Sequence, residues 1–264
     1  MRAVVVALAC NNGCFFCAQG RIRETEGLRD TGVLEGEVIE AAREGVLVAL
    51  VGGEPTLHPA LARLARLARS GGAPDVLVQT NGRRLAYPSY AQALREAGVG
   101  GVDVSLHGST APMHQFHTGA EGSFAQTVTG IGVARGAGMR VGVTVVVTRS
   151  NYRHLAEIAR LAHARGADAL HLALPELRGA ALDAAARLMV PAAMLRPHVV
   201  EASRLAQRLG LGVRVFGRSS GPSVDERFAG PGVAEAAPAP PPRPAPSARR
   251  VELPMIAGVR GAVR

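Results

Sequence analysis

Short runs of β-branched and other apolar residues alternate with longer helical patterns along most of this chain of 264 residues. The runs at 76–78 and 141–147 are nearly continuous apolar stretches, which is typical of strands covered on both faces. Repeated strand–helix–strand units need right-handed crossovers, and these make successive strands parallel neighbours in one sheet. We therefore predict an α/β fold whose parallel sheet is open, or is curved into a full or partial barrel.

The same pattern places the individual elements. Strands are expected at 3–9, 46–51, 75–80, 101–106, 140–147 and 168–174, with a weaker seventh at 211–216. Helices are expected near 35–44, 57–70, 88–97, 122–137, 151–165 and 191–209. Asn151 is a candidate N-cap for the helix that follows it, and Gly166 is placed to end that helix.

The C-terminal part of the chain has a different composition. Residues 230–250 contain seven of the seventeen prolines, most of them in one run at 238–246. Such a segment forms neither a helix nor a central strand, so we expect an extended, disordered linker there. We predict a core domain over residues 1–217 and a C-terminal extension over 218–264.

Cys10, Cys14 and Cys17 are the only cysteines in the chain, and they lie on one short loop after the first predicted strand. Their odd number and the lack of a secretory signal argue against a disulfide framework. Structural zinc usually takes four ligands, so a zinc site would need a histidine in addition. The candidates are His107, His114 and His117. An iron–sulfur cluster on three thiolates would instead keep one iron without a protein ligand. The sequence favours the cluster.

Polar and glycine-rich motifs follow six predicted strands. After the cysteine loop they are Gly52-Gly53-Glu54-Pro55, Thr80-Asn81-Gly82, Ser105-Leu106-His107-Gly108, Thr148-Arg149-Ser150-Asn151 and Leu174-Pro175-Glu176. Each motif alone is an ordinary turn. The carboxyl ends of parallel strands meet on one face of a sheet or barrel, where active sites form. We therefore expect these motifs to converge with the cysteine loop.

Two of these motifs resemble a known family. Cys10-x3-Cys14-x2-Cys17, with Phe16 before the last cysteine and Gly-Gly-Glu-Pro at 52–55, resembles the radical S-adenosylmethionine (SAM) superfamily between about residues 3 and 176. The stretch 104–124 further resembles the branch that contains peptide-modifying maturases and molybdopterin-precursor enzymes. The resemblance implies a partial (β/α)6 TIM-like barrel that binds a [4Fe-4S] cluster and SAM, with SAM chelating the unique iron.

The resemblance also assigns roles to individual residues. The implied cluster ligands are Cys10, Cys14 and Cys17. The implied SAM contacts are Phe16 at the adenine, Gly52, Gly53 and Glu54 at the methionine amino group, Ser105, Asn151 and Leu174. The implied substrate-facing residues are Thr80, Asn81 and His107. Structural alternatives stay open for several of them. Phe16 would pack in its loop, Glu54 or Asn151 would cap a helix, and Ser105 would bond to its own backbone.

The implied reaction is reductive cleavage of SAM to methionine and a 5′-deoxyadenosyl radical, which abstracts hydrogen from an unidentified peptide or small metabolite. The implied electron donor is a protein such as flavodoxin or ferredoxin. No catalytic residue beyond the cofactor contacts stands out. The chain has no cysteine after Cys17, so its own thiolates cannot hold an auxiliary cluster, in contrast to the larger maturases.

Two further functions are weighed against this one. The net charge of +9 suits an RNA-modifying enzyme. Aromatic residues make up only 3% and tryptophan is absent, so a stacking platform for bases is missing and nucleic acid is not the expected partner. A non-catalytic iron–sulfur or zinc-binding module would need the cysteines but not the Gly-Gly-Glu motif. Free thiols and the lack of a membrane-spanning apolar run predict a cytoplasmic protein.

Overall fold

The computed structural model describes residues 1–20, 27–175 and 177–216. Seven parallel strands form one sheet in the order of the sequence, with β1 and β7 at its two edges. The strands are β1 (Arg2–Ala7), β2 (Val48–Gly52), β3 (Val76–Thr80), β4 (Val99–Ser105), β5 (Arg140–Val146), β6 (Ala169–Ala173) and β7 (Gly212–Phe216). The predicted parallel α/β sheet is confirmed, including the weak seventh strand.

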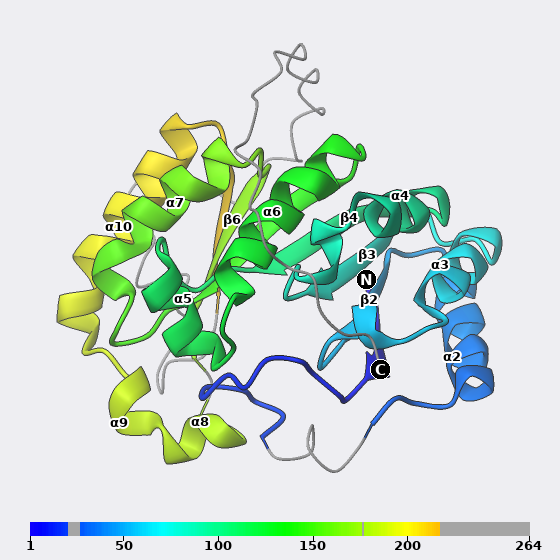
Figure 1. Ribbon diagram of the computed structural model, residues 1–264, viewed down its shortest axis with the longest axis horizontal. Coiled ribbons are helices and arrows are strands. Elements are labelled where there is room, and N and C mark those ends of the chain that lie inside the picture. Colours follow the sequence, from blue (N-terminus) through cyan, green and yellow to red (C-terminus); the bar gives the residue numbers. More distant parts are fainter. Residues whose placement is uncertain (21–26, 176, 217–264) are drawn as a thin grey trace, which may run out of the picture.

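Helices connect the strands and cover one side of the sheet (Figure 1). They are α2 (Thr31–Arg43), α3 (Leu61–Ser70), α4 (Pro88–Glu96), α5 (Ala111–Thr118), α6 (Ser123–Gly136), α7 (Leu155–Ala164), α8 (Ala180–Asp183), α9 (Ala185–Leu188) and α10 (Ala192–Arg208). Three 3-10 turns lie at Pro55–Leu57, Arg84–Ala86 and Tyr152–His154. The helices expected from residues 57 and 151 therefore begin only at Leu61 and Leu155. Helices α5, α8 and α9 were not expected, because none is long enough to show a clear period.

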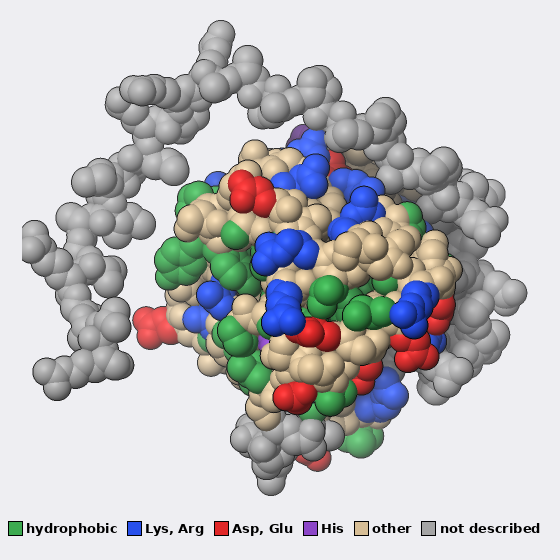
Figure 2. Space-filling view, turned by 90° about the vertical axis from the view of Figure 1, so that its right-hand side faces the viewer, with side chains coloured by type: hydrophobic (Ala, Val, Ile, Leu, Met, Phe, Trp, Pro, Cys, Tyr) green, Lys and Arg blue, Asp and Glu red, His purple; other side chains and the backbone are tan. Residues whose placement is uncertain are grey.

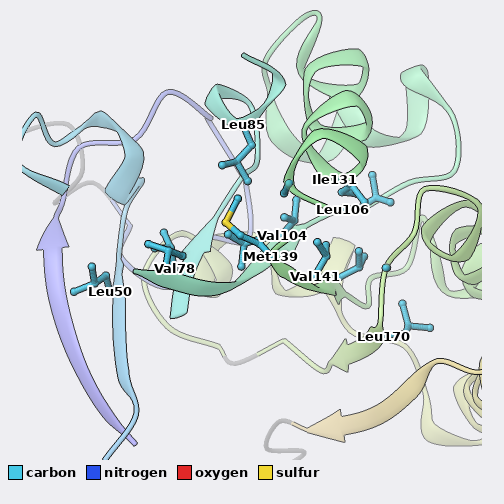
Figure 3. Packing of buried hydrophobic residues seen from close by; sticks show 14 of the residues in the cluster. Leu50, Val78, Leu85, Val104, Leu106, Ile131, Met139, Val141 and Leu170 are labelled. Atoms are coloured by element: carbon cyan, nitrogen blue, oxygen red, sulfur yellow. The ribbon is translucent and has the colours of Figure 1, made fainter. Parts of the chain in front are cut away.

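The hydrophobic core lies between the sheet and these helices. Val78, Val104, Val141 and Leu170 point from four neighbouring strands into this layer, where they meet helix residues such as Ile131 (Figure 3). Side chains alternate along a strand, so the residues between them point to the opposite side. We call that opposite side the inner face of the sheet.

The surface formed by α2, α3 and α4 carries arginines with acidic side chains among them (Figure 2). Arg63 of α3 pairs with Glu35 of α2, with Nε 2.9 Å from Oε1, and Arg69 donates to the carbonyl of Ala73. This is the pattern of an ordinary charged surface. No helix of the described residues is long and apolar enough to cross a membrane.

The proline-rich segment at 230–250 lies outside the described residues. The division into a core at 1–217 and an extension at 218–264 therefore stays a prediction.

Candidate functional site

The cysteine loop follows β1 directly, and its backbone is anchored at both ends. The three cysteines are half-buried, and the Cys17 amide donates to the Cys14 carbonyl at 3.2 Å. The Gly13 amide donates to the carbonyl of Thr118, at the end of α5, at 2.6 Å. The Cys17 carbonyl accepts from Ala180, the first residue of α8. The loop thus lies between two helical segments that are distant in sequence, and Figure 1 shows α8 beside it.

The Gly-Gly-Glu turn packs against the backbone that leads into this loop. The Gly53 amide donates to the Ala7 carbonyl at 2.7 Å, and the Glu54 amide donates to the Ala9 carbonyl at 2.9 Å. A Cβ atom on Gly53 would collide with the carbonyl oxygens of Leu8 and Ala9. Glycine is needed here because two backbones approach each other closely.

The Glu54 side chain joins the ends of β2 and β3. It is fully buried, and its Oε1 accepts hydrogen bonds from the Thr56 amide at 3.0 Å and from the hydroxyls of Thr56 and Thr80 at 2.6 Å. Its Oε2 accepts from the Asn81 amide at 2.6 Å. Burial raises the pKa of the Glu54 carboxyl, and the four hydrogen bonds oppose that shift. The carboxylate both caps the 3-10 turn and supports β3, so a SAM contact from Glu54 would have to come from its backbone.

The end of β3 reaches back to the cysteine loop. Asn81 Nδ2 donates to Asn11 Oδ1 at 2.6 Å. Arg83 donates to the Asn11 carbonyl and, at 3.1 Å, to Asn12 Oδ1. Its Nε is held by Gln126 of α6 at 2.6 Å. These bonds position the residues between Cys10 and Cys14.

A second buried network joins the ends of β4 and β5. Asn151 is fully buried, and its Nδ2 donates to the carbonyls of His107 at 3.0 Å and Val146 at 2.9 Å. Its Oδ1 accepts from the Thr148 amide at 2.7 Å. The Asn151 side chain therefore does not cap the helix after it, and its contact with SAM stays a prediction.

His107 and His114 form the centre of this network. His114 Nδ1 accepts from the His107 amide at 3.1 Å, and His107 Nδ1 accepts from the Val146 amide at 3.3 Å. Each ring accepts at Nδ1 and therefore carries its proton at Nε2. Phe16 packs edge-on against His107, with the ring centroids 4.8 Å apart. His107 therefore helps to position Phe16 of the cysteine loop.

The structure also places three further residues to which the resemblance assigns a contact with SAM or substrate. Ser105 lies on the inner face at the end of β4, in register with Thr144 of β5. Thr80 lies on the helix-covered side of β3 with its hydroxyl bound to Glu54, and the neighbouring Gln79 points to the inner face. Leu174 packs in the core, and its amide donates to the Phe216 carbonyl at 2.7 Å. SAM and substrate contacts by these residues stay predictions.

A family model described as the radical SAM superfamily matches residues 4–162, which is more than half of the chain. This chain belongs to the radical SAM superfamily.

Curated relatives of this chain carry two different names. The chain is 31% identical over 174 residues to a probable GTP 3′,8-cyclase of Metallosphaera sedula, a match that covers 64% of this chain and 53% of that protein. It is 32% identical over 165 residues to the AdoMet-dependent heme synthase of Methanosarcina barkeri, a match that covers 62% of this chain and 47% of that protein. The chain spans about half the length of the curated relatives it matches. It is a radical SAM enzyme.

Solved structures show the same fold. Streptococcus suis SuiB bound to S-adenosylmethionine superposes with a TM-score of 0.65 at 16% identity, covering 82% of this chain and 50% of that one. SuiB bound to its precursor peptide SuiA gives a TM-score of 0.67 at 18% identity, covering 82% and 48%. The open seven-stranded sheet is therefore the partial TIM-like barrel of this superfamily.

Radical SAM membership implies SAM and an iron–sulfur cluster, and the cysteine loop fits the cluster. Its donor set is three half-buried sulfurs on one anchored loop, and thiolates are the usual ligands of iron–sulfur clusters. Each thiolate of such a cluster binds a different iron, so the three need not converge on one point. Among the described residues, no three His, Cys, Asp or Glu side chains are gathered to hold a single metal ion.

Two parts of this radical SAM site were not found from the sequence. Arg83 follows the Thr-Asn-Gly turn and looks like any surface arginine, although it binds the cysteine loop. Helices α8 and α9 pack Ala181, Ala184 and Leu188 against Phe15 and Phe16. The one sequence signal for the packing of α8 on the cysteine loop is Gly179, just before this helix. Its backbone approaches that of Ala18 and Gly20 closely.

The buried histidines predict that the enzyme loses stability in acid. Burial lowers the pKa of His107 and of His117, and it lowers that of His114 from 6.5 to about 4. Below pH 6.5 the unfolded chain binds protons that the folded chain excludes, so the free energy of unfolding falls as the pH falls. His114 alone accounts for about 3 kcal/mol between pH 7.5 and 4. Urea unfolding at pH 7.5, 6 and 5 checks this prediction. A pH-independent unfolding free energy over this range would contradict the prediction.

Proposed function

We propose that this enzyme cleaves SAM reductively at a [4Fe-4S] cluster held by Cys10, Cys14 and Cys17, and that the resulting 5′-deoxyadenosyl radical abstracts hydrogen from a peptide or small-molecule substrate. The observation that carries the proposal is the junction of three strand ends around one cysteine loop. Gly53 and Glu54 bind the backbone before Cys10, and Asn81 binds Asn11 immediately after it. When bound, the cluster supplies the electron that breaks a carbon–sulfur bond of SAM.

The protein's own contribution is to position the reacting groups and to exclude competing reactions. The three cysteines would occupy three irons and keep the fourth for the amino and carboxyl groups of SAM. Phe16 is half-buried between His107 and helices α8–α9, which would keep one side of its ring against the adenine. Ser105 on the inner face would contact SAM next to it, and the backbone at 52–54 would receive the methionine amino group.

The electron would come from a carrier protein such as flavodoxin or ferredoxin. The net charge of +9 favours a carrier of opposite charge, because long-range attraction raises the rate of encounter. The relatives act, by their names, on GTP and in heme synthesis, and SuiB was solved with a precursor peptide. A small metabolite and a peptide are therefore both candidate substrates.

Replacing one cluster ligand tests this proposal. After anaerobic reconstitution with iron and sulfide, the reduced wild-type protein is expected to release 5′-deoxyadenosine from SAM without substrate. Cys14→Ala removes one thiolate and should lower that rate roughly 100-fold or more. Ser70→Ala, on an exposed helix end, is the control and should keep the wild-type rate. Product is measured by liquid chromatography with mass spectrometry.

Two results would overturn the proposal. One is a brown reconstituted protein that releases no 5′-deoxyadenosine with any reductant, which would indicate a binding module. The other is an unchanged rate in Cys14→Ala. If neither result is obtained, comparing metabolite and peptide profiles of cells with and without the enzyme would identify the substrate.

A further inference from the structure

A cluster of polar side chains lies on the inner face, next to Ser105. It consists of Asp103 on β4, Thr144 on β5 and His171 on β6. Thr144 Oγ1 lies 2.8 Å from both carboxylate oxygens of Asp103 and 3.3 Å from His171 Nδ1. His171 Nδ1 also lies 3.4 Å from Asp103 Oδ1. The inner side of a barrel sheet is usually filled by branched apolar side chains, so a carboxylate and an imidazole here need another explanation.

The strand register builds room for this cluster. Thr144 pairs with His171 across β5 and β6, and Asp103 pairs with Gly142 across β4 and β5. A Cβ atom on Gly142 would lie 3.1 Å from Asp103 Oδ1 and 3.2 Å from His171 Cε1. The missing side chain at 142 therefore allows the carboxylate and the imidazole to approach each other across β5.

Hydrogen-bond chemistry determines which nitrogen of His171 is free. The Asp103 carboxylate only accepts, and the single proton of Thr144 is directed to it. The contacts of His171 Nδ1 with Thr144 and Asp103 are then satisfied only if Nδ1 carries the proton. Nε2 is therefore a lone-pair acceptor in the neutral ring. The His171 side chain is 23% exposed, so part of the ring is accessible on the inner face.

Two side chains of β7 extend this surface. Arg214 pairs with His171 in the register of β6 and β7, so both side chains lie on the same face of the sheet, and Arg214 is exposed. The Phe216 ring lies 6.3 Å from the His171 ring, at an angle of 62°, and is 45% exposed. The inner face thus presents a hydrogen-bond acceptor, a guanidinium and an aromatic ring side by side.

We propose that His171, oriented by Asp103 and Thr144, and Arg214 bind the substrate, and that this substrate is a small anion with an N–H or O–H group. The guanidinium would bind its phosphate or carboxylate, and His171 Nε2 would accept from its N–H or O–H donor. This inference rests on the proposed function, because it places the substrate on the barrel face that the cofactor site borders. It favours a small metabolite over an uncharged peptide segment.

Binding of defined probes to the reconstituted enzyme, measured by calorimetry, tests the proposal. GTP represents a phosphate with N–H donors, malate represents a carboxylate with a hydroxyl, and guanosine is the uncharged control. We expect the wild type to bind GTP, malate or both, and to bind the uncharged guanosine at least tenfold more weakly than the anion that binds. Arg214→Gln and His171→Gln should each weaken binding of that anion about tenfold, with Arg214→Lys intermediate. Arg204→Gln, an exposed arginine on α10, should bind like the wild type.

A spectroscopic measurement separates binding from mere folding. In ¹⁵N-labelled enzyme, His171 Nε2 should show the chemical shift of an unprotonated ring nitrogen, and the bound anion should change that shift. A protonated Nε2 together with a deprotonated Nδ1 would overturn the proposal. So would binding that is unchanged in both glutamine variants, or a wild type that binds neither anion at millimolar concentration. Binding needs no SAM turnover, so these outcomes are independent of the 5′-deoxyadenosine test of the proposed function.

Discussion

Replacing Gly53 by alanine is expected to remove 5′-deoxyadenosine formation and to destabilise the fold by about 3 kcal/mol or more. A Cβ atom at this position would lie 2.8 Å from the Leu8 carbonyl carbon and would collide with the carbonyl oxygens of Leu8 and Ala9. These atoms are backbone, so they cannot rotate away. Relief requires that the segment before Cys10 moves and that the bond from the Gly53 amide to the Ala7 carbonyl is lost. The displaced segment carries the first cysteine of the loop.

The matched control for this substitution is Gly36→Ala. Gly36 lies on the exposed side of α2, and a Cβ atom there would meet no neighbour within 4 Å. Alanine is the better helix former, so this variant should gain about 0.5–1 kcal/mol and keep full activity. Both variants are compared by urea unfolding and by SAM cleavage after reconstitution. A Gly53→Ala protein with the stability and rate of the wild type would show that the close backbone approach is dispensable.

The order of the strands was predictable because their apolar runs are long and bounded by turn residues. Val141–Val147 is the clearest example, and even the weak run at 211–216 forms the seventh strand. The connections were less predictable. Helices α8 and α9 have four residues each, which is barely more than one turn, and they form because Ala181, Ala184 and Leu188 pack on the aromatic residues of the cysteine loop. Such a tertiary cause leaves little trace in local sequence.

The convergence of the site was predictable from topology, since polar motifs at the carboxyl ends of parallel strands must meet. The directions of their side chains were not. The side chains of Thr80 and Asn151 bond to protein groups that hold the strand ends together, and no sequence pattern predicted these bonds. Asp103 and His171 drew no attention because they lie within strands, 68 positions apart, and only the register brings them together. A sequence pattern locates a strand end better than it assigns a buried hydrogen bond.

Replacing Glu54 by alanine is expected to cost about 4 kcal/mol of folding stability. The substitution removes one acceptor group that serves four donors, and the amides of Thr56 and Asn81 then stay buried without a partner. Glu54→Gln is the informative intermediate. Its amide oxygen can replace Oε1, but its NH₂ group would then face the Asn81 amide, which is also a donor. We expect this variant to lose about 2 kcal/mol.

Glu37→Ala is the matched surface control for the Glu54 variants. Glu37 forms a two-bond ion pair with Arg29 at 2.6 and 2.8 Å, but both side chains are partly exposed, so its loss should cost less than about 1 kcal/mol. Chemical unfolding ranks the three variants, and cluster content per chain shows the consequence for the site. Asn81 joins the Glu54 carboxylate to Asn11 beside Cys10, so Glu54→Ala should also retain less iron after desalting. Equal stability and iron content in the Glu54 and Glu37 variants would mean that the carboxylate is replaceable, and that the bonds of the cysteine loop to Arg83, Thr118 and Ala180 suffice to hold it.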